Sequence, residues 1–401
     1  MSNIVLYLHA HQPYRVRHYT IFDAGKSSDY FTAPVGSRES NRDIINKVSE
    51  KSYLPTNKVL LHLLTTVPEF KLSLSITGTL LEQLRDHRPD VLASFKALVD
   101  TGKVEIVGET YYHSLAFFHD RQEFERQVEA HSQICEELLN YKPHSFRNTE
   151  LAYNNELGSW CDSKGYEAVI TEGWDPVLGW RSPNHMYRPL NATKTKLLVK
   201  NYHLSDDIAF RFGNQTWSEW PMSADKFTYW IHEGSPDADI INLFMDFETF
   251  GEHQWQESGI FDFLTHLPSK WGLKEGSGFM TISEAARTYE AKDELDIHNT
   301  ITWADTERDL TAWLGNTMQT QAFDAVYALA ESVLASNDQS IIDDWRKLQT
   351  SDHFYYMCTK YFNDGDVHAY FSPYESPYVG QMNYMNVLLD VKNRLSQKGL
   401  L

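Results

Sequence analysis

The segment IINLFMDFETFGEHQW, residues 240–255, changes abruptly from apolar to acidic residues. Its first six positions are almost wholly apolar, which is typical of a strand buried on both faces of a parallel sheet. The run ends in Asp246 and Glu248, and α/β barrel enzymes carry their reactive groups at such strand ends. The segment SFRNTEL, residues 145–151, places Glu150 in a similar position. Two carboxyl groups at two strand ends predict acid–base chemistry on a glycosidic bond.

Short apolar runs recur along the first 245 residues and alternate with amphipathic segments such as 80–100 and 123–139. Alternation of strands and helices predicts an α/β fold in which helices cover a parallel sheet. Seven strands favour a distorted (β/α)7 barrel, although an open doubly wound sheet fits the same pattern. The seven predicted strands are residues 4–8, 71–76, 104–107, 145–147, 168–170, 196–200 and 240–245.

The pattern changes after about residue 300, where only helical periodicity remains. Three long helices are expected, at residues 305–336, 340–362 and 377–395, with turn residues at 337–338 and 363–366. The sequence therefore predicts a catalytic barrel over residues 1–300 and a C-terminal α-helical bundle over residues 301–401. The turn Asn363-Asp364-Gly365-Asp366 resembles part of a calcium loop, but it lacks the complete ligand spacing and the terminal Glu.

Composition excludes several classes of partner. The 401 residues include 36 Lys and Arg against 55 Asp and Glu, a formal charge of −19, which argues against nucleic acid and anionic membranes. Three distant cysteines without CxxC spacing fit a reducing compartment. The N-terminal segment lacks a basic start, and no stretch approaches the roughly 20 apolar residues of a membrane span. We expect a cytoplasmic protein, without a prediction of its oligomeric state.

Glu150 and Asp246 are the candidate catalytic residues. A carboxylate at Glu150 could attack an anomeric carbon, with Arg147 and nearby donors keeping it ionised. The segment around Glu150 alone also fits an ordinary surface acid. Asp246 closes an apolar run, where a carboxylate is costly unless it is paired or belongs to a site. We expect burial to raise the pKa of Asp246, as the role of general acid requires.

Histidines and tryptophans supply the remaining candidates. His9 and His11 project to the same side of the first strand, a spacing that suits either sugar-hydroxyl hydrogen bonds or a metal. A metal site would need further ligands, and the candidates are His113, His203, Asp206 and His253. Tryptophans after strands could stack on sugar rings or fill the core; these are Trp174, Trp180, Trp217, Trp220 and Trp255.

Five segments, in this order, resemble the motifs of glycoside hydrolase family 57, and specifically of its α-amylase-like members. Each motif is weakly specific by itself, but five in the same order cover most of the chain. The motifs are His9-Ala10-His11-Gln12-Pro13, Gly108-Glu109-Thr110-Tyr111-Tyr112-His113, Phe146-Arg147-Asn148-Thr149-Glu150-Leu151, Asp246-Phe247-Glu248-Thr249-Phe250-Gly251 and residues 307–316, ERDLTAWLGN.

The resemblance implies a (β/α)7 barrel followed by a helical bundle, α-glucan substrates, retention of configuration, no cofactor and no required metal. It implies Glu150 as nucleophile and Asp246 as general acid/base. It further implies sugar contacts through His11 and Trp313 and, by motif position alone, through Glu109, His113, Glu248 and His253. The strand-end positions of His9, Trp174 and Trp255 add these three as candidate sugar contacts.

The expected function is an α-amylase-like hydrolase that cleaves α-1,4-glucosidic bonds in starch, glycogen or maltodextrin by double displacement. A 4-α-glucanotransferase or branching enzyme on the same scaffold is the nearest alternative. Branching members tend to be longer, with inserted loops that this chain lacks, which favours hydrolysis. A metal-dependent hydrolase built on His9 and His11 and a non-catalytic glucan-binding protein are the remaining alternatives.

Overall fold

Seven parallel strands form a distorted barrel. The computed structural model describes residues 2–273, 276–360 and 371–401. In it the strands pair in the orders β3-β2-β1-β8 and β4-β5-β7, and a parallel bridge between Gly108 and Phe146 joins β3 to β4. The sheet is looser between β7 and β8, where Asn201 N–H donates to the Asn242 carbonyl at 2.9 Å. The bounds are β1 Asn3–Ala10, β2 Leu72–Ile76, β3 Val104–Ile106, β4 Ser145–Arg147, β5 Ala168–Thr171, β7 Lys196–Val199 and β8 Ile240–Asp246.

The predicted strands coincide with these seven, so the predicted (β/α)7 fold is confirmed. The register explains how one end of the barrel becomes polar. His9 on β1 pairs with Asp246 on β8 and with Ser75 on β2. The apolar runs therefore end at the same level, and the polar residues that follow them gather at the C-terminal end of the barrel.

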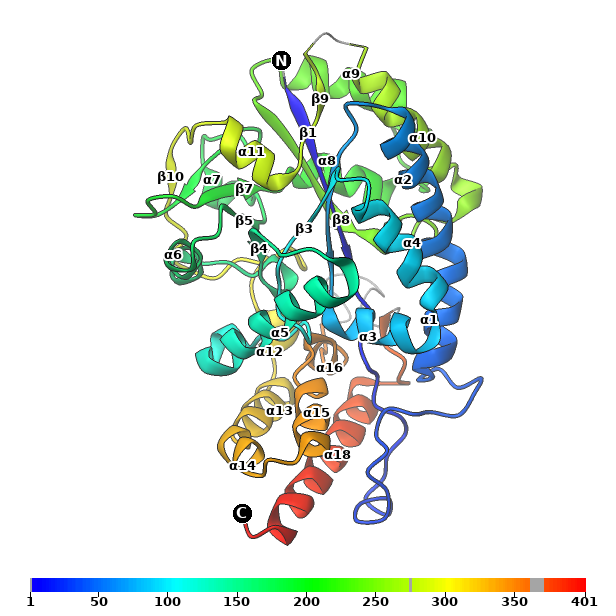
Figure 1. Cartoon of the computed structure of the whole chain (residues 1–401), viewed down its shortest axis with the longest axis vertical. Coiled ribbons are helices and arrows are strands. Elements are labelled where there is room, and N and C mark those ends of the chain that lie inside the picture. Colours follow the sequence, from blue (N-terminus) through cyan, green and yellow to red (C-terminus); the bar gives the residue numbers. More distant parts are fainter. Residues whose placement is uncertain (1, 274–275, 361–370) are drawn as a thin grey trace.

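Helices cover the outside of the barrel (Figure 1). The predicted helical stretch at 80–100 divides into α3 and α4 at Arg88, because the residue before a proline, here Pro89, disfavours helical backbone. The covering helices are α1 Asn41–Val48, α2 Leu54–Thr66, α3 Gly78–His87, α4 Pro89–Val99, α5 Arg121–Leu139, α6 Asn155–Lys164, α7 Asp175–Leu178, α8 Tyr202–Asp206, α9 Ala224–Gly234, α10 Ile260–Trp271 and α11 Ile282–Thr288. Short strands lie at β6 Arg188–Pro189, β9 Gly278–Phe279 and β10 Glu294–Leu295.

In the described residues after β10 the regular elements are all helices. They are α12 Thr311–Leu314, α13 Thr317–Tyr327, α14 Ala330–Ala335, α15 Gln339–Lys347, α16 Ser351–Tyr355 and α18 Pro377–Gln397. The predicted long helices are divided: Asn316 caps the start of α13, with Gln319 completing a capping box. The turn Asn363-Asp364-Gly365-Asp366 lies outside the described residues. The boundary at residue 300 stays a prediction.

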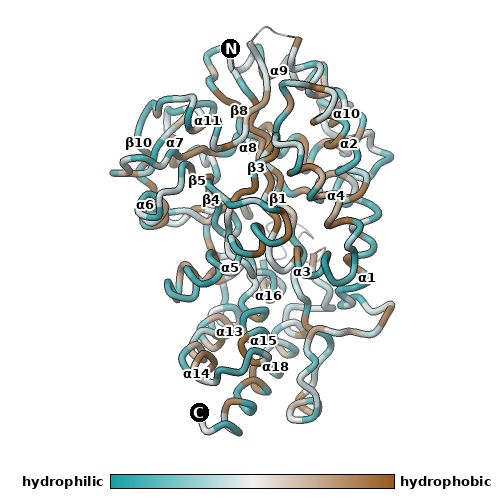
Figure 2. Tube along the Cα trace, in the orientation of Figure 1, coloured by the Kyte–Doolittle hydropathy of each residue, from teal (hydrophilic) through white to brown (hydrophobic). Residues whose placement is uncertain are grey.

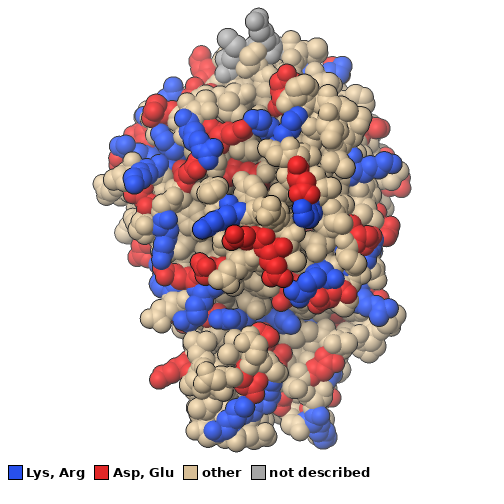
Figure 3. All heavy atoms as spheres, viewed as in Figure 1, with Lys and Arg blue, Asp and Glu red and all other residues tan. Residues whose placement is uncertain are grey.

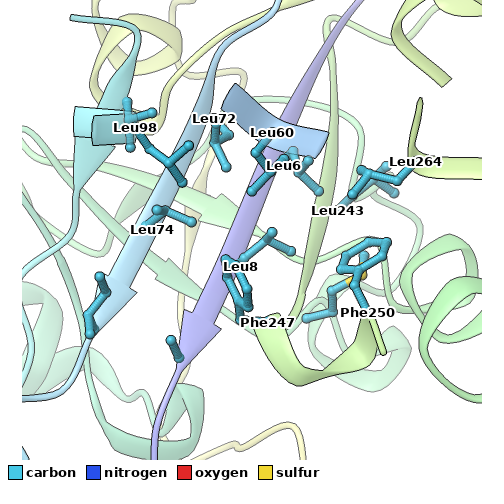
Figure 4. Packing of buried hydrophobic residues seen from close by; sticks show 14 of the residues in the cluster. Leu6, Leu8, Leu60, Leu72, Leu74, Leu98, Leu243, Phe247, Phe250 and Leu264 are labelled. Atoms are coloured by element: carbon cyan, nitrogen blue, oxygen red, sulfur yellow. The ribbon is translucent and has the colours of Figure 1, made fainter. Parts of the chain in front are cut away.

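Two large hydrophobic clusters stabilise the fold. In the first, leucines of the sheet pack under helices α2, α4 and α10, as Figure 4 shows for Leu60, Leu98 and Leu264. In Figure 2 brown is concentrated on the central strands and alternates with teal along the helices. The second cluster joins Phe146 on β4 to Trp345 and Val387 of the C-terminal helices. The helical region is therefore packed directly on the barrel.

The surface carries both signs of charge. Figure 3 shows Lys and Arg interspersed with Asp and Glu over the whole visible face. Among the described residues, no helix combines the length and the apolar character that a membrane crossing requires.

Candidate active site

A cavity of about 420 Å³ opens at the C-terminal end of the barrel, where the C-terminal helices approach it. Glu150 and Asp246 both line it, although 95 residues separate them in the chain. Most of the other predicted site residues line it too: His9, His11, His113, Glu248, His253 and Trp313. Acids from two strands thus face one cavity, as two carboxyl groups that share a substrate must.

Glu150 is held by three hydrogen-bond donors. It follows β4 in left-handed backbone (φ +59°), a conformation that non-glycine residues seldom adopt outside constrained sites. Its Oε1 accepts from His113 Nε2 at 3.0 Å and from Ser351 Oγ at 3.3 Å, and its Oε2 accepts from the Trp303 indole at 2.7 Å. Burial raises the pKa of Glu150, but the hydrogen bonds from His113 and Trp303 outweigh it, and the net pKa lies below the ordinary value. Glu150 is thus an ionised, oriented carboxylate.

A chain of closely spaced histidine and carboxylate side chains connects Glu150 with Asp246. His113 Nδ1 lies 3.5 Å from Glu109 Oε2, His9 Nε2 lies 3.3 Å from the same oxygen, and His9 Nδ1 lies 3.6 Å from Asp246 Oδ1. Burial lowers the pKa of His113, but the hydrogen bonds with Glu109 and Glu150 outweigh it and raise the pKa to about 9. His113 is therefore an imidazolium at neutral pH and offers Glu150 a charged donor.

The expected rise in the pKa of Asp246 is wrong for the protein without substrate. Desolvation does raise the pKa, but the hydrogen bond with His9 and the charges of His253 and Arg147 outweigh it, and the pKa lies below its usual value. The Asp246 side chain is also 41% exposed to the open cavity. The Asp246 carboxylate therefore stays partly hydrated until a ligand occupies the cavity.

Glu248 differs from both of these acids. Its Oε1 accepts from the Tyr53 hydroxyl at 2.5 Å and from the His11 backbone N–H at 3.3 Å. Burial and the negative charge of Asp246 raise the pKa of Glu248 to about 8. One carboxyl group on the cavity wall therefore keeps its proton at neutral pH.

The C-terminal region contributes groups that the sequence did not indicate. Asp352, on α16, accepts from His11 Nε2 at 3.0 Å, and Ser351 and Trp303 both contact Glu150. Asp352 and Trp303 line the cavity. None of them follows a predicted strand. Ser351 and Asp352 lie in sequence predicted to be helical, and Trp303 lies in the connection before the helix predicted at 305–336.

The histidine cluster bears on the metal alternative. His9, Glu109 and His113 have ligand atoms close enough to share an ion. However, Arg147 Nη1 lies 3.0 Å from His9 Nε2, 3.2 Å from Glu109 Oε2 and 3.4 Å from His113 Nδ1. A guanidinium nitrogen thus occupies the space between these three residues, and the protonated His113 ring has no lone pair to offer a metal ion at neutral pH.

One other group of possible ligands and two single residues concern the remaining metal candidates. His11, His113 and Asp352 also have ligand atoms within reach of one ion, but Nε2 of His113 is already bonded to Glu150 and Nε2 of His11 to Asp352. His203 does not line the cavity and lies 3.8 Å from Asp175. Asp206 lines the cavity and accepts from Lys200 Nζ at 3.0 Å.

Three predicted sugar contacts lie away from the cavity surface. Glu109 is fully buried beneath His9 and His113. Trp174 packs against the hydrophobic cluster of the C-terminal helices. Trp255 is 62% exposed, with Lys51 Nζ 5.6 Å from its ring centroid. Among the tryptophans named from the sequence, only Trp313 lines the cavity, together with Trp303, which the sequence analysis missed.

Comparison with known proteins gives consistent matches. The model of Glycosyl hydrolase family 57 matches residues 5–298. A protein of Methanocaldococcus jannaschii named "Putative alpha-amylase" is 38% identical over 391 residues, covering 95% of this chain and 82% of that protein.

Solved structures share the fold. A GH57 branching enzyme from Thermococcus kodakaraensis has a TM-score of 0.71 at 12% identity, covering 98% of this chain and 90% of that chain. The 4-alpha-glucanotransferase from Thermococcus litoralis has a TM-score of 0.65 at 15% identity, covering 88% of this chain but only 56% of that longer chain.

Proposed function

The chain belongs to glycosyl hydrolase family 57, and from this premise we propose that it is a retaining, α-amylase-like hydrolase. Its substrates would be starch, glycogen or maltodextrin, cleaved at α-1,4-glucosidic bonds. The observation that supports this proposal most is that Glu150 and Asp246 line the same cavity. A cytoplasmic location remains part of the proposal.

In the first step Glu150 would attack the anomeric carbon. The bond between that carbon and the glycosidic oxygen breaks, Asp246 gives its proton to the departing oxygen, and a glycosyl ester of Glu150 forms. In the second step Asp246 takes a proton from water, the water oxygen attacks the same carbon, and Glu150 leaves as a carboxylate. Double displacement requires the two carboxyl groups to lie roughly 5 Å apart.

Substrate binding would raise the pKa of Asp246, so that Asp246 takes up from solvent the proton that it later gives to the departing oxygen. A sugar that fills the cavity displaces water from the exposed part of the Asp246 side chain. Loss of that hydration disfavours the carboxylate and raises its pKa. Glu150, in contrast, keeps its three donors and stays ionised. The two acids thereby acquire the different protonation states that the first step requires.

The Glu150→Gln variant tests the assignment of the nucleophile. The amide keeps the size of the side chain but cannot attack, so kcat on maltooligosaccharides should fall at least about 10³-fold. The fold and oligosaccharide binding should persist, as measured by circular dichroism and calorimetry. The matched control is Glu156→Gln on the exposed face of α6, where Glu156 pairs with Arg121; it should keep full activity. Wild-type turnover in Glu150→Gln would remove Glu150 from the mechanism.

Transfer to another sugar is the second candidate function, because the similar solved structures include a glucanotransferase and a branching enzyme. Incubation with maltotriose separates the two reactions. Hydrolysis yields only glucose and maltose, whereas products longer than the substrate indicate transfer. Activity measured after chelation, with elemental analysis of the same sample, tests the metal-dependent alternative. A total lack of turnover on every glucan would favour a non-catalytic binding protein.

A further inference from the structure

Glu248 is a buried acid on the cavity wall, and no Lys or Arg of the described part of the chain pairs with it. It is 5% exposed and follows β8 in the short helix η5, Phe247–Thr249. Within the described residues no Lys or Arg nitrogen lies within ion-pairing distance of it, and its hydrogen-bond donors include the Tyr53 hydroxyl and the His11 backbone N–H. A buried carboxylate without a compensating charge is costly, and protonation removes that cost.

Its hydrogen bonds distinguish the two carboxyl oxygens. The Tyr53 hydroxyl and the His11 backbone N–H both donate to Oε1. An oxygen that accepts two donors is suited to be the carbonyl oxygen of a neutral acid. The proton then belongs on Oε2, and a protonated carboxyl is a hydrogen-bond donor. The cavity would thus gain a donor that a carboxylate cannot provide.

The charged and titratable groups around Glu248 favour the neutral form. Asp246 on β8 carries the nearest negative charge and opposes a second one. Burial lowers the pKa of His11 to about 4, so this ring is uncharged at neutral pH. Burial also lowers the pKa of His253 in the loop after η5. Arg15, the guanidinium on this side of the cavity, donates to the Gln12 side chain and the Pro13 carbonyl.

We propose that Glu248 acts as a neutral carboxylic acid that donates a hydrogen bond to a sugar hydroxyl, and that its ionisation weakens productive binding at alkaline pH. This role rests on the proposed function, since it needs a substrate rich in hydroxyl groups. It adds a third acid to the cavity, distinct from the ionised Glu150 and from Asp246. On ionisation the donor is lost, and a second negative charge appears beside Asp246.

The first test compares the pH profiles of kcat/KM, which report groups of the free enzyme. Each profile is normalised to its own value at pH 6, so that a change in affinity does not enter. The wild type should lose activity through a basic limb centred near pH 8. This limb adds to the decline from lower pH that the loss of the Asp246 proton in the free enzyme already causes. Glu248→Gln cannot ionise, and its limb should move to about pH 9, where His113 titrates. The same limb in both proteins would overturn the proposal.

Glu252→Gln is the matched control, four residues further along the same loop. Glu252 pairs with Lys47 at 2.6 Å and does not line the cavity. Its profile should keep the limb near pH 8, whereas a shift equal to that of Glu248→Gln would assign the limb to general charge and contradict a specific role for Glu248.

A second measurement needs no turnover. Infrared difference spectra, wild type minus Glu248→Gln, should show a protonated carboxyl band at pH 7 that converts to a carboxylate band through about pH 8. A carboxylate band alone at pH 7 would overturn the proposal. Protein that shows the acid band but has no activity on any glucan would contradict the proposed function and leave the neutral acid established.

Discussion

Trp303 Nε1 donates to Oε2 of Glu150, whereas His113 and Ser351 both contact Oε1. Trp303→Phe keeps an aromatic ring and deletes that donor. A hydrogen bond to a charged group contributes about 1.5–3 kcal/mol, so kcat should fall roughly 10- to 100-fold. Because the donor lowers the pKa of Glu150, its loss raises that pKa, and the acid limb of kcat/KM should move to higher pH.

Trp180→Phe is the control for this change, since Trp180 is 86% exposed and lies outside the cavity. Its rate and its acid limb should match those of the wild type. If Trp303→Phe also leaves both quantities unchanged, the indole does not hold Glu150 for reaction. The hydrogen bond between Trp303 and Glu150 joins positions 153 residues apart in the chain, and no local sequence pattern predicts it.

At the scale of elements, the loop after β8 depends on close backbone approach. Gly251 has φ +104°, and a β-carbon there would overlap the Lys51 carbonyl oxygen. Gly259 has φ +84° with open space around it. Gly259→Ala should therefore lower the free energy of unfolding by about 1 kcal/mol through backbone strain alone. Gly251→Ala should lower it by at least about 2 kcal/mol, because steric overlap adds to the strain.

Urea unfolding of both variants checks this difference, and activity provides a second readout. Gly251 follows Asp246 and Glu248 closely, so its substitution should also reduce turnover, whereas Gly259→Ala should not. Equal losses of stability in the two variants would show that the overlap with the Lys51 carbonyl oxygen is relieved without further loss of folding free energy.

Elements were predictable where their signal is local. Most of the barrel strands are apolar runs followed by polar residues, and β8 with Asp246 is the clearest of them. The exception is β4, Ser145–Arg147, which has a weak signal and was placed mainly by its position in the alternation. Helix boundaries were harder to predict, because each depends on a single residue. Pro89 ends α3 at Arg88, and the side chain of Asn316 caps the start of α13. Strand-end reasoning found Glu150, Asp246 and their histidines.

The contacts that the C-terminal region makes in the cavity, and the protonation state of Glu248, could not be predicted from the sequence. Asp352 meets His11 across 341 residues, and it does so from a helix. Trp303 and Ser351 likewise reach Glu150 only because the C-terminal region folds back on the barrel. The neutral state of Glu248 depends on Tyr53 and on burial, both of which are properties of the packed structure.

At the scale of the whole molecule, the barrel and the C-terminal helices share one hydrophobic cluster, in which Phe146, Trp345 and Val387 take part. Units that share a core should unfold together. We therefore expect a single thermal transition, with the calorimetric enthalpy equal to the van't Hoff enthalpy. Two resolved transitions would instead indicate a barrel and a helical bundle that are stable separately, divided near the boundary predicted at residue 300.

Covalent trapping measures the central chemistry most directly. Asp246→Asn, treated with a 5-fluoro-α-glucosyl fluoride, should form the glycosyl ester and then stall, because fluoride leaves without an acid and no base activates water. Trypsin should release residues 148–164 with the mass of one added sugar, and fragmentation should place it on Glu150 rather than on Glu156. Double displacement predicts that label. A sugar attached to another residue would contradict it. So would an unlabelled variant together with a wild-type enzyme that releases products of inverted configuration.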